Sequence, residues 1–171
     1  RDRVICENKR YFCTGDVLFD HQKTLSGARF PESKSFDAVI LETTRGETER
    51  KSGKTRTSEI DRLLTTVRNV LRRGGSVLIP VFALGRMQEI LTIINEARNS
   101  GDIPECPVFG AGLGLAVADH LDQISKRTGQ AKFSRRTIKE LRLRRPPRQL
   151  KPGKEPPQQG IYIVSSGMLI E

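Results

Sequence analysis

The sequence predicts an α/β fold built on a largely parallel sheet that helices flank. Short apolar runs alternate along the chain with longer segments in which apolar residues recur every three or four positions, and this alternation is typical of strand–helix–strand units. With 171 residues, 36% of them hydrophobic and 29% charged, the chain can bury a core, and the composition excludes global disorder. No apolar run approaches the roughly 18 residues that a membrane helix needs, so we expect no membrane partner.

Five stretches are predicted to form strands. A short strand pair is expected within 3–12, and the compact apolar run from Asp37 to Glu42 predicts a buried strand with a polar end. The remaining strands are expected at 76–82, 107–109 and 161–164.

The segments between these strands predict helices. Ser58 opens the first helix, because Ser58 and Asp61 fit an N-terminal capping pattern and the apolar residues of 60–71 follow a helical stripe. Gly74 provides its stop. The other helices are expected over about 84–101, from the glycine-rich turn 110–114 to Gly129, and around Thr137 and Glu140, which fit a capping box.

Unusual polar residues follow the predicted strands, at the edge where parallel sheets bind ligands. They are Asp16, Glu42, Arg86, the glycine-rich turn 110–114 and the segment 165–167. Each has an ordinary interpretation by itself, as a turn aspartate, a strand-end carboxylate, a surface arginine or a serine cap. The functional hypothesis therefore rests on their combination and order.

The positive charge is concentrated in one segment. The net charge is +10, and residues 126–154 carry +11, so the other 142 residues sum to −1. A concentrated positive field attracts polyanions, and phosphate backbones are the commonest partner. A solvated basic loop is the alternative. The candidate phosphate-binding residues of this segment are Arg142, Arg144, Arg145 and Arg148.

Other common sites are not supported by the spacing of their residues. The turn 110–114 lacks the third-glycine spacing of a dinucleotide fingerprint, and no phosphate loop of the GxxxxGK[ST] type is present. His21 and His120 are too far apart in sequence for a zinc motif. The three cysteines form no CxxC pair, which favours reduced thiols and a cytoplasmic location.

In their order along the chain, five motifs resemble the β-CASP branch of the metallo-β-lactamase superfamily, the RNA- and DNA-processing nucleases. The motifs are Tyr11–Asp16, Val39–Gly46, Leu78–Leu91, Pro107–Gly114 and Val164–Leu169. The resemblance covers about 3–125 and 161–171. It implies the C-terminal part of a metallo-β-lactamase-type domain over 1–46. A β-CASP-type domain would then occupy 47–171, with a basic, Pro-rich insertion at about 126–160.

The resemblance also implies roles for individual residues. Asp16 corresponds to an aspartate that bridges two zinc ions, and Glu42 to an acid that orients a histidine supplied later in the chain. Arg86 and Ser165-Ser166-Gly167 correspond to surfaces that line a nucleic-acid groove. The implied protein is a zinc-dependent ribonuclease that hydrolyses phosphodiester bonds in RNA processing, with two zinc ions that activate a water molecule.

The sequence departs from the family pattern in its histidines. The HxHxDH cluster that should precede Asp16 and the histidines expected after Ser166 are absent. We therefore expect an excerpt of such a protein, inactive and without bound zinc when isolated. A non-catalytic nucleic-acid-binding or scaffold relative is the main alternative. A hydrolase of small esters is disfavoured by the basic segment. RNA is expected rather than DNA, and homo-oligomerisation is left open.

Overall fold

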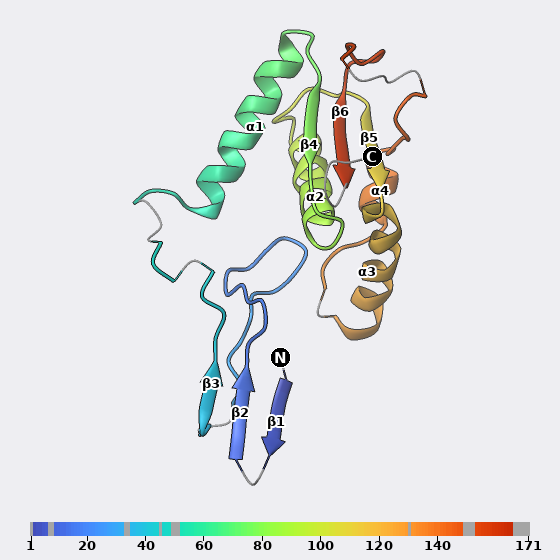
Figure 1. Ribbon diagram of the computed structural model, residues 1–171. Coiled ribbons are helices and arrows are strands. Elements are labelled where there is room, and N and C mark those ends of the chain that lie inside the picture. Colours follow the sequence, from blue (N-terminus) through green and yellow to red (C-terminus); the bar gives the residue numbers. More distant parts are fainter. Residues whose placement is uncertain are drawn as a thin grey trace. The chain divides into compact units, whose positions relative to one another are not determined.

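The computed structural model describes residues 2–6, 9–32, 35–44, 46–48, 52–129, 131–148 and 153–165 (Figure 1). The chain divides into two compact units. Unit 1 comprises 1–21 and 26–53, and unit 2 comprises 22–25 and 54–171. Both units contain parallel strands, and helices flank the sheet of unit 2, so the predicted α/β class is confirmed. None of the helices in the described ranges is long and apolar enough to cross a membrane.

Unit 1 contains a three-stranded sheet in the order β1-β2-β3. Strand β1 (Asp2–Cys6) pairs antiparallel with β2 (Lys9–Cys13), and β2 pairs in parallel with β3 (Ala38–Ile40). Phe12 is buried, with its ring centroid 5.3 Å from that of Phe36.

The prediction of a buried strand at 37–42 was wrong in length and in burial. The strand β3 has three residues, and the side chains of Val39, Ile40 and Leu41 are more than half exposed. The physical reason is that the described part of unit 1 contains no helix that could cover this sheet.

The described residues of unit 2 form a parallel sheet in the order β4-β6-β5 and four helices (Figure 1). The last strand of the chain therefore lies in the middle of the sheet. The strands are β4 (Val77–Pro80), β5 (Val108–Gly112) and β6 (Ile161–Ser165). The helices are α1 (Arg56–Arg72), α2 (Arg86–Asn99), α3 (Gly114–Thr128) and α4 (Arg136–Glu140).

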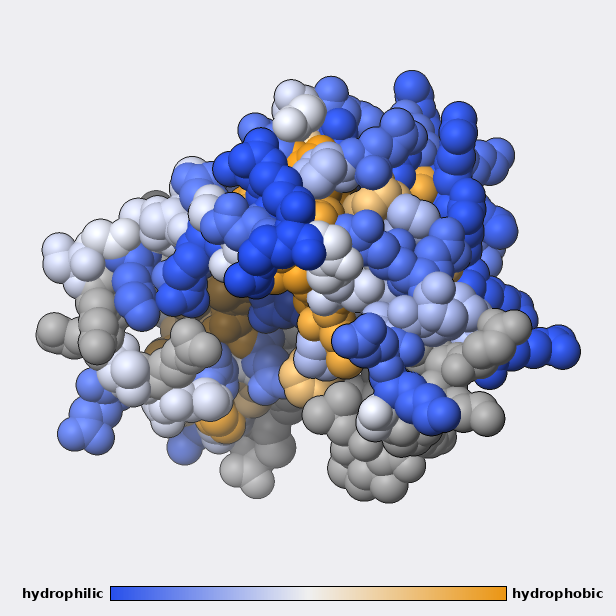
Figure 2. Space-filling model, turned by 90° about the horizontal axis from the view of Figure 1, so that it is seen from above, coloured by the Kyte–Doolittle hydropathy of each residue, from blue (hydrophilic) through white to orange (hydrophobic). Residues whose placement is uncertain are grey.

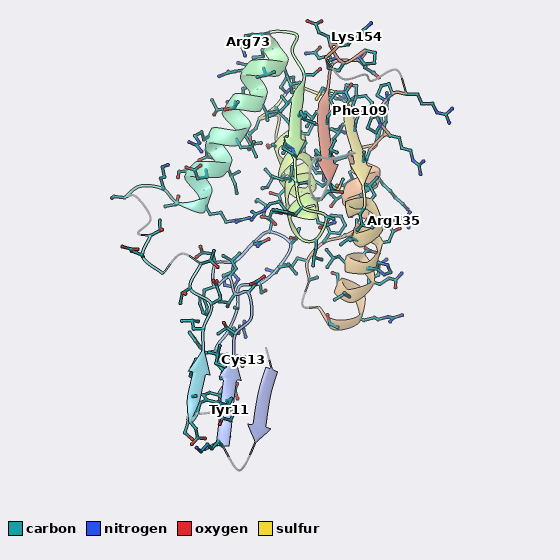
Figure 3. All side chains as sticks on the ribbon, in the orientation of Figure 1. Tyr11, Cys13, Arg73, Phe109, Arg135 and Lys154 are labelled. Atoms are coloured by element: carbon teal, nitrogen blue, oxygen red, sulfur yellow. The ribbon has the colours of Figure 1, made fainter. Side chains whose placement is uncertain are left out.

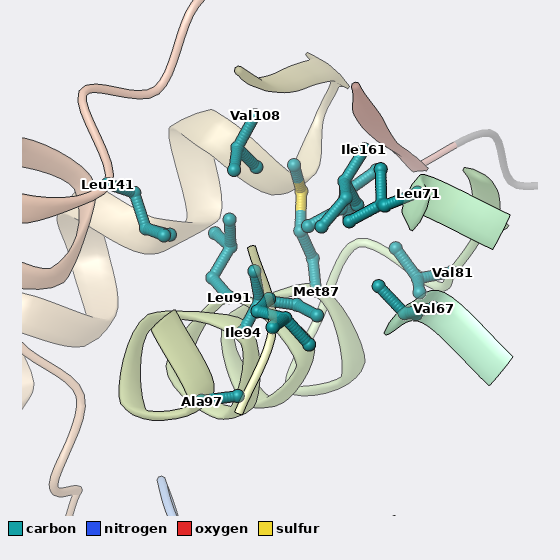
Figure 4. Close-up of a cluster of buried hydrophobic side chains, with 12 residues drawn as sticks. Val67, Leu71, Val81, Met87, Leu91, Ile94, Ala97, Val108, Leu141 and Ile161 are labelled. Atoms are coloured by element: carbon teal, nitrogen blue, oxygen red, sulfur yellow. The ribbon is translucent and has the colours of Figure 1, made fainter. Parts of the chain in front are cut away.

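The core of unit 2 lies between its sheet and helices α1 and α2 (Figure 4). Met87, Leu91 and Ile94 from α2 are fully buried against Ile161 and Ile163 from β6. Every residue of β6 except Val164 is buried, as expected for a central parallel strand. Burial of one such aliphatic side chain contributes roughly 1.5–3 kcal/mol, so this cluster holds the helices on the sheet.

Helix α1 begins two residues before the predicted start at Ser58. Thr55 is the N-cap: its hydroxyl accepts a hydrogen bond from the Ser58 N–H at 3.1 Å, and the Thr55 N–H donates to the Ser58 hydroxyl at 2.9 Å. This is a capping box with serine in place of glutamate. Beyond the helix end, Gly74 has a positive φ of 79°, as predicted for the stop.

The predicted capping box of Thr137 and Glu140 was wrong. Helix α4 already includes Arg136, and its N-cap Arg135 makes no side-chain capping bond. Glu140 turns to helix α2, where it accepts a hydrogen bond from Asn95 Nδ2 at 2.7 Å, and it also pairs with Arg136. The Glu140 carboxylate, which the sequence pattern assigned to a helix cap, therefore forms tertiary contacts in place of the cap.

Candidate functional site

The residues predicted to carry chemistry in unit 1 lie at one edge of its sheet. Strands β2 and β3 are parallel, so their carboxyl ends meet at the same edge. Thr14, which is buried, connects the two ends: its N–H donates to the Ile40 carbonyl at 3.0 Å, and its hydroxyl accepts from the Glu42 N–H at 3.2 Å. Asp16 follows two residues after Thr14 and is exposed.

The Glu42 carboxylate is held within this edge by hydrogen bonds. The Thr44 N–H donates to it at 2.9 Å. Hydrogen bonds from the Thr44 backbone and hydroxyl, and a weaker one from the Val17 N–H, hold the pKa of Glu42 below its ordinary value. Because Val17 adjoins Asp16, the structure brings together the two segments that carry Asp16 and Glu42, as predicted.

A zinc site is not assembled by the described residues alone. They contain no group of three or more His, Cys, Asp and Glu side chains that could hold a metal ion. His21 is engaged elsewhere, because its Nδ1 accepts a hydrogen bond from the Gly27 N–H at 3.1 Å. Since zinc sites need three or four protein ligands, the donor set of the described residues does not fit two zinc ions by itself.

In unit 2, the predicted residues lie at the carboxyl edge of the β4-β6-β5 sheet. Arg86 is the first residue of helix α2 and is exposed, directly after Gly85, which has a positive φ of 76° and offers no side-chain cap. The N-terminus of a helix favours anions, and arginine adds a charge-assisted donor. This placement is compatible with phosphate binding by Arg86.

Ser165 has a structural role at the same edge, because its hydroxyl bonds to other parts of the protein. It is buried, its hydroxyl accepts from the Gly114 N–H at 2.7 Å, and it donates to the Ala111 carbonyl at 3.3 Å. Its side chain therefore joins the end of β6 to the turn before helix α3. Ser166 and Gly167, the other residues predicted for this surface, lie outside the described residues.

Sequence reasoning missed Gln88, which joins two turns at this edge. Its side chain is fully buried, and its Nε2 donates to the Ala83 carbonyl at 3.1 Å and to the Gly114 carbonyl at 2.8 Å. Gln88 lies within the Leu78–Leu91 motif, but the motif assigned it no role, because only the fold brings these turns together.

The glycine-rich turn at this edge is a close-packed turn, as predicted, because a Cβ on Gly114 would lie 2.2 Å from the Met87 sulfur.

The basic segment separates into paired and unpaired cations. Three basic residues form ion pairs with Asp122, Asp119 and Glu140; these are Lys126, Arg135 and Arg136, respectively. Arg135 is marked in Figure 3, beside α3 and α4. In contrast, several exposed basic residues of the segment have no ion-pair partner among the described residues. They include Arg127 and the four arginines predicted from the sequence, Arg142, Arg144, Arg145 and Arg148.

Backbone hydrogen bonds fix the position of Arg144, one of the unpaired arginines. The Arg144 N–H donates to the Val108 carbonyl at 2.9 Å, and the Gly110 N–H donates to the Arg144 carbonyl at 2.8 Å. Arg144 thus pairs with the free edge of strand β5, while Leu143 packs against the core. The predicted insertion is therefore tied to the sheet where its charge is highest, and single unpaired arginines beside a strand can contact successive phosphates.

A cavity of about 680 Å³ lies at the opposite end of unit 2, near the amino end of strand β4. Leu78, Tyr162 and Val164 contribute to its lining, together with Lys154 and Pro156. Viewed from above, hydrophilic side chains cover most of the face and surround a narrow apolar strip (Figure 2). Parallel sheets bind ligands at the carboxyl ends of their strands, so the candidate site remains at the edge that carries Arg86.

Comparison with known proteins finds relatives that match more than half of this chain. The transcription termination factor FttA of Methanothermobacter thermautotrophicus is 36% identical over 102 residues, which are 58% of this chain and 15% of that protein. The endoribonuclease YSH1 of Gibberella zeae is 36% identical over 101 residues, 58% of this chain and 12% of that protein. The RNase J-like protein of Methanocaldococcus jannaschii is 34% identical over 106 residues, 62% of this chain and 25% of that protein. No family model matches the chain.

These relatives are β-CASP proteins of the metallo-β-lactamase superfamily. The predicted resemblance is therefore confirmed, and the chain is a homologue of β-CASP metallo-β-lactamase nucleases. The matched stretch spans about an eighth to a quarter of the length of these three relatives.

Proposed function

We propose that this chain is part of a metal-dependent ribonuclease that hydrolyses phosphodiester bonds during RNA processing. The observation that carries the proposal is the identity of 34–36% over more than half of the chain to proteins named as an endoribonuclease and as RNase J-like. The exposed, unpaired arginines beside strand β5 support an RNA partner in the same chain.

In this proposal, unit 1 is the C-terminal part of the metallo-β-lactamase-type domain, and unit 2 is the β-CASP-type domain with its basic insertion. The division of the chain into two compact units supports the assignment. The boundary then follows residue 53, where the sequence predicted residue 46. Residues 22–25 belong to unit 2 although their neighbours in sequence belong to unit 1.

Asp16 is proposed to supply one ligand to a metal centre whose other ligands lie outside this sequence. Zinc, with two ions, is the proposed metal. An exposed carboxylate at the carboxyl edge of a parallel strand pair is accessible to further ligands. Glu42 is proposed to orient a histidine from elsewhere in the protein, in keeping with its lowered pKa, which keeps the carboxylate ionised at neutral pH.

RNA binding is proposed to use Arg86 together with the four arginines predicted in the basic segment, Arg142, Arg144, Arg145 and Arg148. Guanidinium groups bind phosphate oxygens with two parallel hydrogen bonds. The N-terminus of helix α2, where Arg86 lies, adds the positive end of the helix dipole. Ser165 is proposed to shape this surface through the turn that it holds. The preference for RNA over DNA, homo-oligomerisation and a cytoplasmic location stay predictions.

A non-catalytic RNA-binding relative is the second candidate. The observation that favours it is the incomplete donor set, since the described residues contain no group of three metal-ligating side chains. The two candidates predict the same RNA-binding surface and differ only in the importance of Asp16.

The decisive experiment compares the full-length protein with its Asp16→Asn variant. Asn keeps the shape of the side chain but removes the charge, so RNA cleavage is expected to fall by orders of magnitude while RNA affinity stays within about twofold. Glu42→Gln is expected to lower cleavage less, since Glu42 acts through another residue. Cleavage by Asp16→Asn at the parent rate would exclude the metal role and leave the non-catalytic candidate.

A further inference from the structure

The loop that follows Asp16 has an unusual path. Residues 17–30 form a loop within the connection between β2 and β3, and the two arms of this loop contact each other in unit 1. The Ala28 N–H donates to the Leu18 carbonyl at 2.7 Å, and the rings of Phe19 and Phe30 stack with centroids 5.1 Å apart. The tip of the loop, residues 22–25, belongs to unit 2.

The tip forms a compact turn that is bonded to the basic segment. The Gln22 N–H donates to the Leu25 carbonyl at 2.8 Å, which closes the turn. The Thr24 carbonyl accepts from the Lys132 N–H at 2.7 Å, and Leu25 forms an antiparallel bridge with Ala131. These bonds hold one side of the tip.

Glu89 of helix α2 holds the other side. Its carboxylate accepts hydrogen bonds from the Lys23 N–H, the Thr24 N–H and the Thr24 hydroxyl, each at 3.0 Å, and it also pairs with the Arg56 guanidinium. Only 1% of Glu89 is exposed, and Thr24 is equally buried. Four donors from three residues therefore converge on one buried carboxylate.

The lowered pKa of Glu89 agrees with a role in which its ionised carboxylate holds the tip. Burial raises its pKa, but the hydrogen bonds from Lys23, Arg56 and Thr24 outweigh burial, so that the pKa lies below its ordinary value. The carboxylate is therefore ionised at neutral pH. Its loss would leave buried donors without an acceptor, which is among the more costly changes in a protein.

Glu96 provides an internal comparison on the same helix. It lies two turns after Glu89, is about half exposed, and pairs with the Lys23 Nζ at 2.5 Å. An exposed ion pair of this kind contributes little to stability. Both acids contact the tip, but only Glu89 bonds to its backbone.

We propose that Glu89 is a positioning residue that docks the 22–25 tip on helix α2. This docking fixes the tip of the loop that starts after Asp16. The docking itself is independent of the proposed nuclease activity. Its consequence for catalysis, through Asp16, rests on that proposed function.

Hydrogen exchange of the full chain, followed by mass spectrometry, tests the docking. Glu89→Gln is expected to speed exchange at the amides of 22–25 by about tenfold or more, while exchange within α2 and β6 changes by less than about twofold. Glu96→Gln, the matched control, is expected to leave the tip unchanged. Equal acceleration of amide exchange throughout unit 2 would show that Glu89 stabilises the whole unit and not the tip in particular. Unchanged exchange at 22–25 would show that Glu89 does not hold the tip. Either result overturns the proposal.

If Glu89→Gln does not fold, Arg56→Ala provides a second variant for the hydrogen-exchange test. It removes one donor and leaves Glu89 with the backbone donors of the tip, so a smaller acceleration confined to 22–25 is expected. Acceleration spread over the whole unit, or none at the tip, would contradict the proposal.

Kinetics of the full-length protein separate this inference from the proposed function. Glu89→Gln is expected to lower kcat for RNA cleavage with KM changed by less than about twofold, because the substitution leaves Arg86 and the four predicted arginines, Arg142, Arg144, Arg145 and Arg148, in place. If exchange at the tip rises but kcat does not fall, docking stands and the link to Asp16 is wrong. If the parent cleaves no RNA, the proposed function fails, and the exchange experiment still decides the docking.

Discussion

The two units of this chain differ in how much of their structure they stabilise by themselves. Unit 2 has a central strand buried on both faces and a core shared by three strands and two helices. Unit 1 has a three-stranded sheet whose strand β3 leaves its apolar side chains exposed. The comparison shows that candidate binding residues in unit 2 are placed by a complete core. The candidate metal residue of unit 1 lies on a sheet that the described residues cover only in part.

The largest expected effect concerns this difference in packing. Leu91→Ala removes a fully buried side chain from unit 2 and should destabilise it by about 2–5 kcal/mol. Leu41→Ala, at a half-exposed position of unit 1, should change stability by less than about 1 kcal/mol. Urea unfolding measures both effects. It is followed by helical circular dichroism for unit 2 and by backbone hydrogen exchange for unit 1, whose described residues contain no helix. Equal effects would show that the two units share one core.

Replacement of the four unpaired arginines tests whether the basic surface of unit 2 binds RNA. The variant with Arg142, Arg144, Arg145 and Arg148 changed to Ala should bind single-stranded RNA at least about tenfold more weakly. The slope of log K against log salt should flatten by roughly 0.7 for each lost phosphate contact. Fluorescence anisotropy over a salt series measures both.

The ion-paired cations of the same segment supply the control for that experiment. Changing Lys126, Arg135 and Arg136 to Ala should cost much less affinity, because their charges are already balanced by Asp122, Asp119 and Glu140. If both variants lose the same affinity, net charge alone attracts the RNA and the arrangement beside β5 has no special role.

The pH dependence of stability should separate the two glutamates with lowered pKa values. Glu89 has a folded-state pKa below its ordinary value of 4.5, so its contribution to stability is present above about pH 4.5 and is lost as the pH falls through the folded-state pKa. Glu89→Gln should therefore flatten the acid limb of the stability curve, measured by urea unfolding between pH 3 and 7. Glu42→Gln should flatten it little, since water screens Glu42.

The smallest expected effect concerns the start of helix α1. Thr55→Ala removes the N-cap hydroxyl and should destabilise unit 2 by about 1 kcal/mol. Asp61→Ala, which removes the acid that the sequence pattern assigned to the cap, should cost less than about 0.5 kcal/mol. Thermal unfolding resolves this difference. A larger effect for Asp61→Ala than for Thr55→Ala would support the predicted helix start at Ser58.

Much of the fold followed from local patterns. The helical stripe of 60–71 and the apolar run at 161–164 predicted α1 and β6, because the period of apolar residues is fixed by backbone geometry. The motif around Asp16 and Glu42 placed both residues at strand ends, and parallel pairing brought those ends together. The four arginines stood out by charge alone, since the surrounding segment has almost no acids.

The sequence by itself thus determined the α/β class, most of the helices and strands, and the resemblance to β-CASP proteins. Only the tertiary structure decided which polar groups meet. Glu140 bonds Asn95 and not its predicted cap, and Ser165 bonds Gly114. Glu89 accepts hydrogen bonds from residues 66, 65 and 33 positions away. A buried carboxylate must be satisfied by whichever donors the packed elements bring within reach, and these partners lie far apart in sequence. No local pattern encodes such pairings, because they form only when the core has fixed the elements in space.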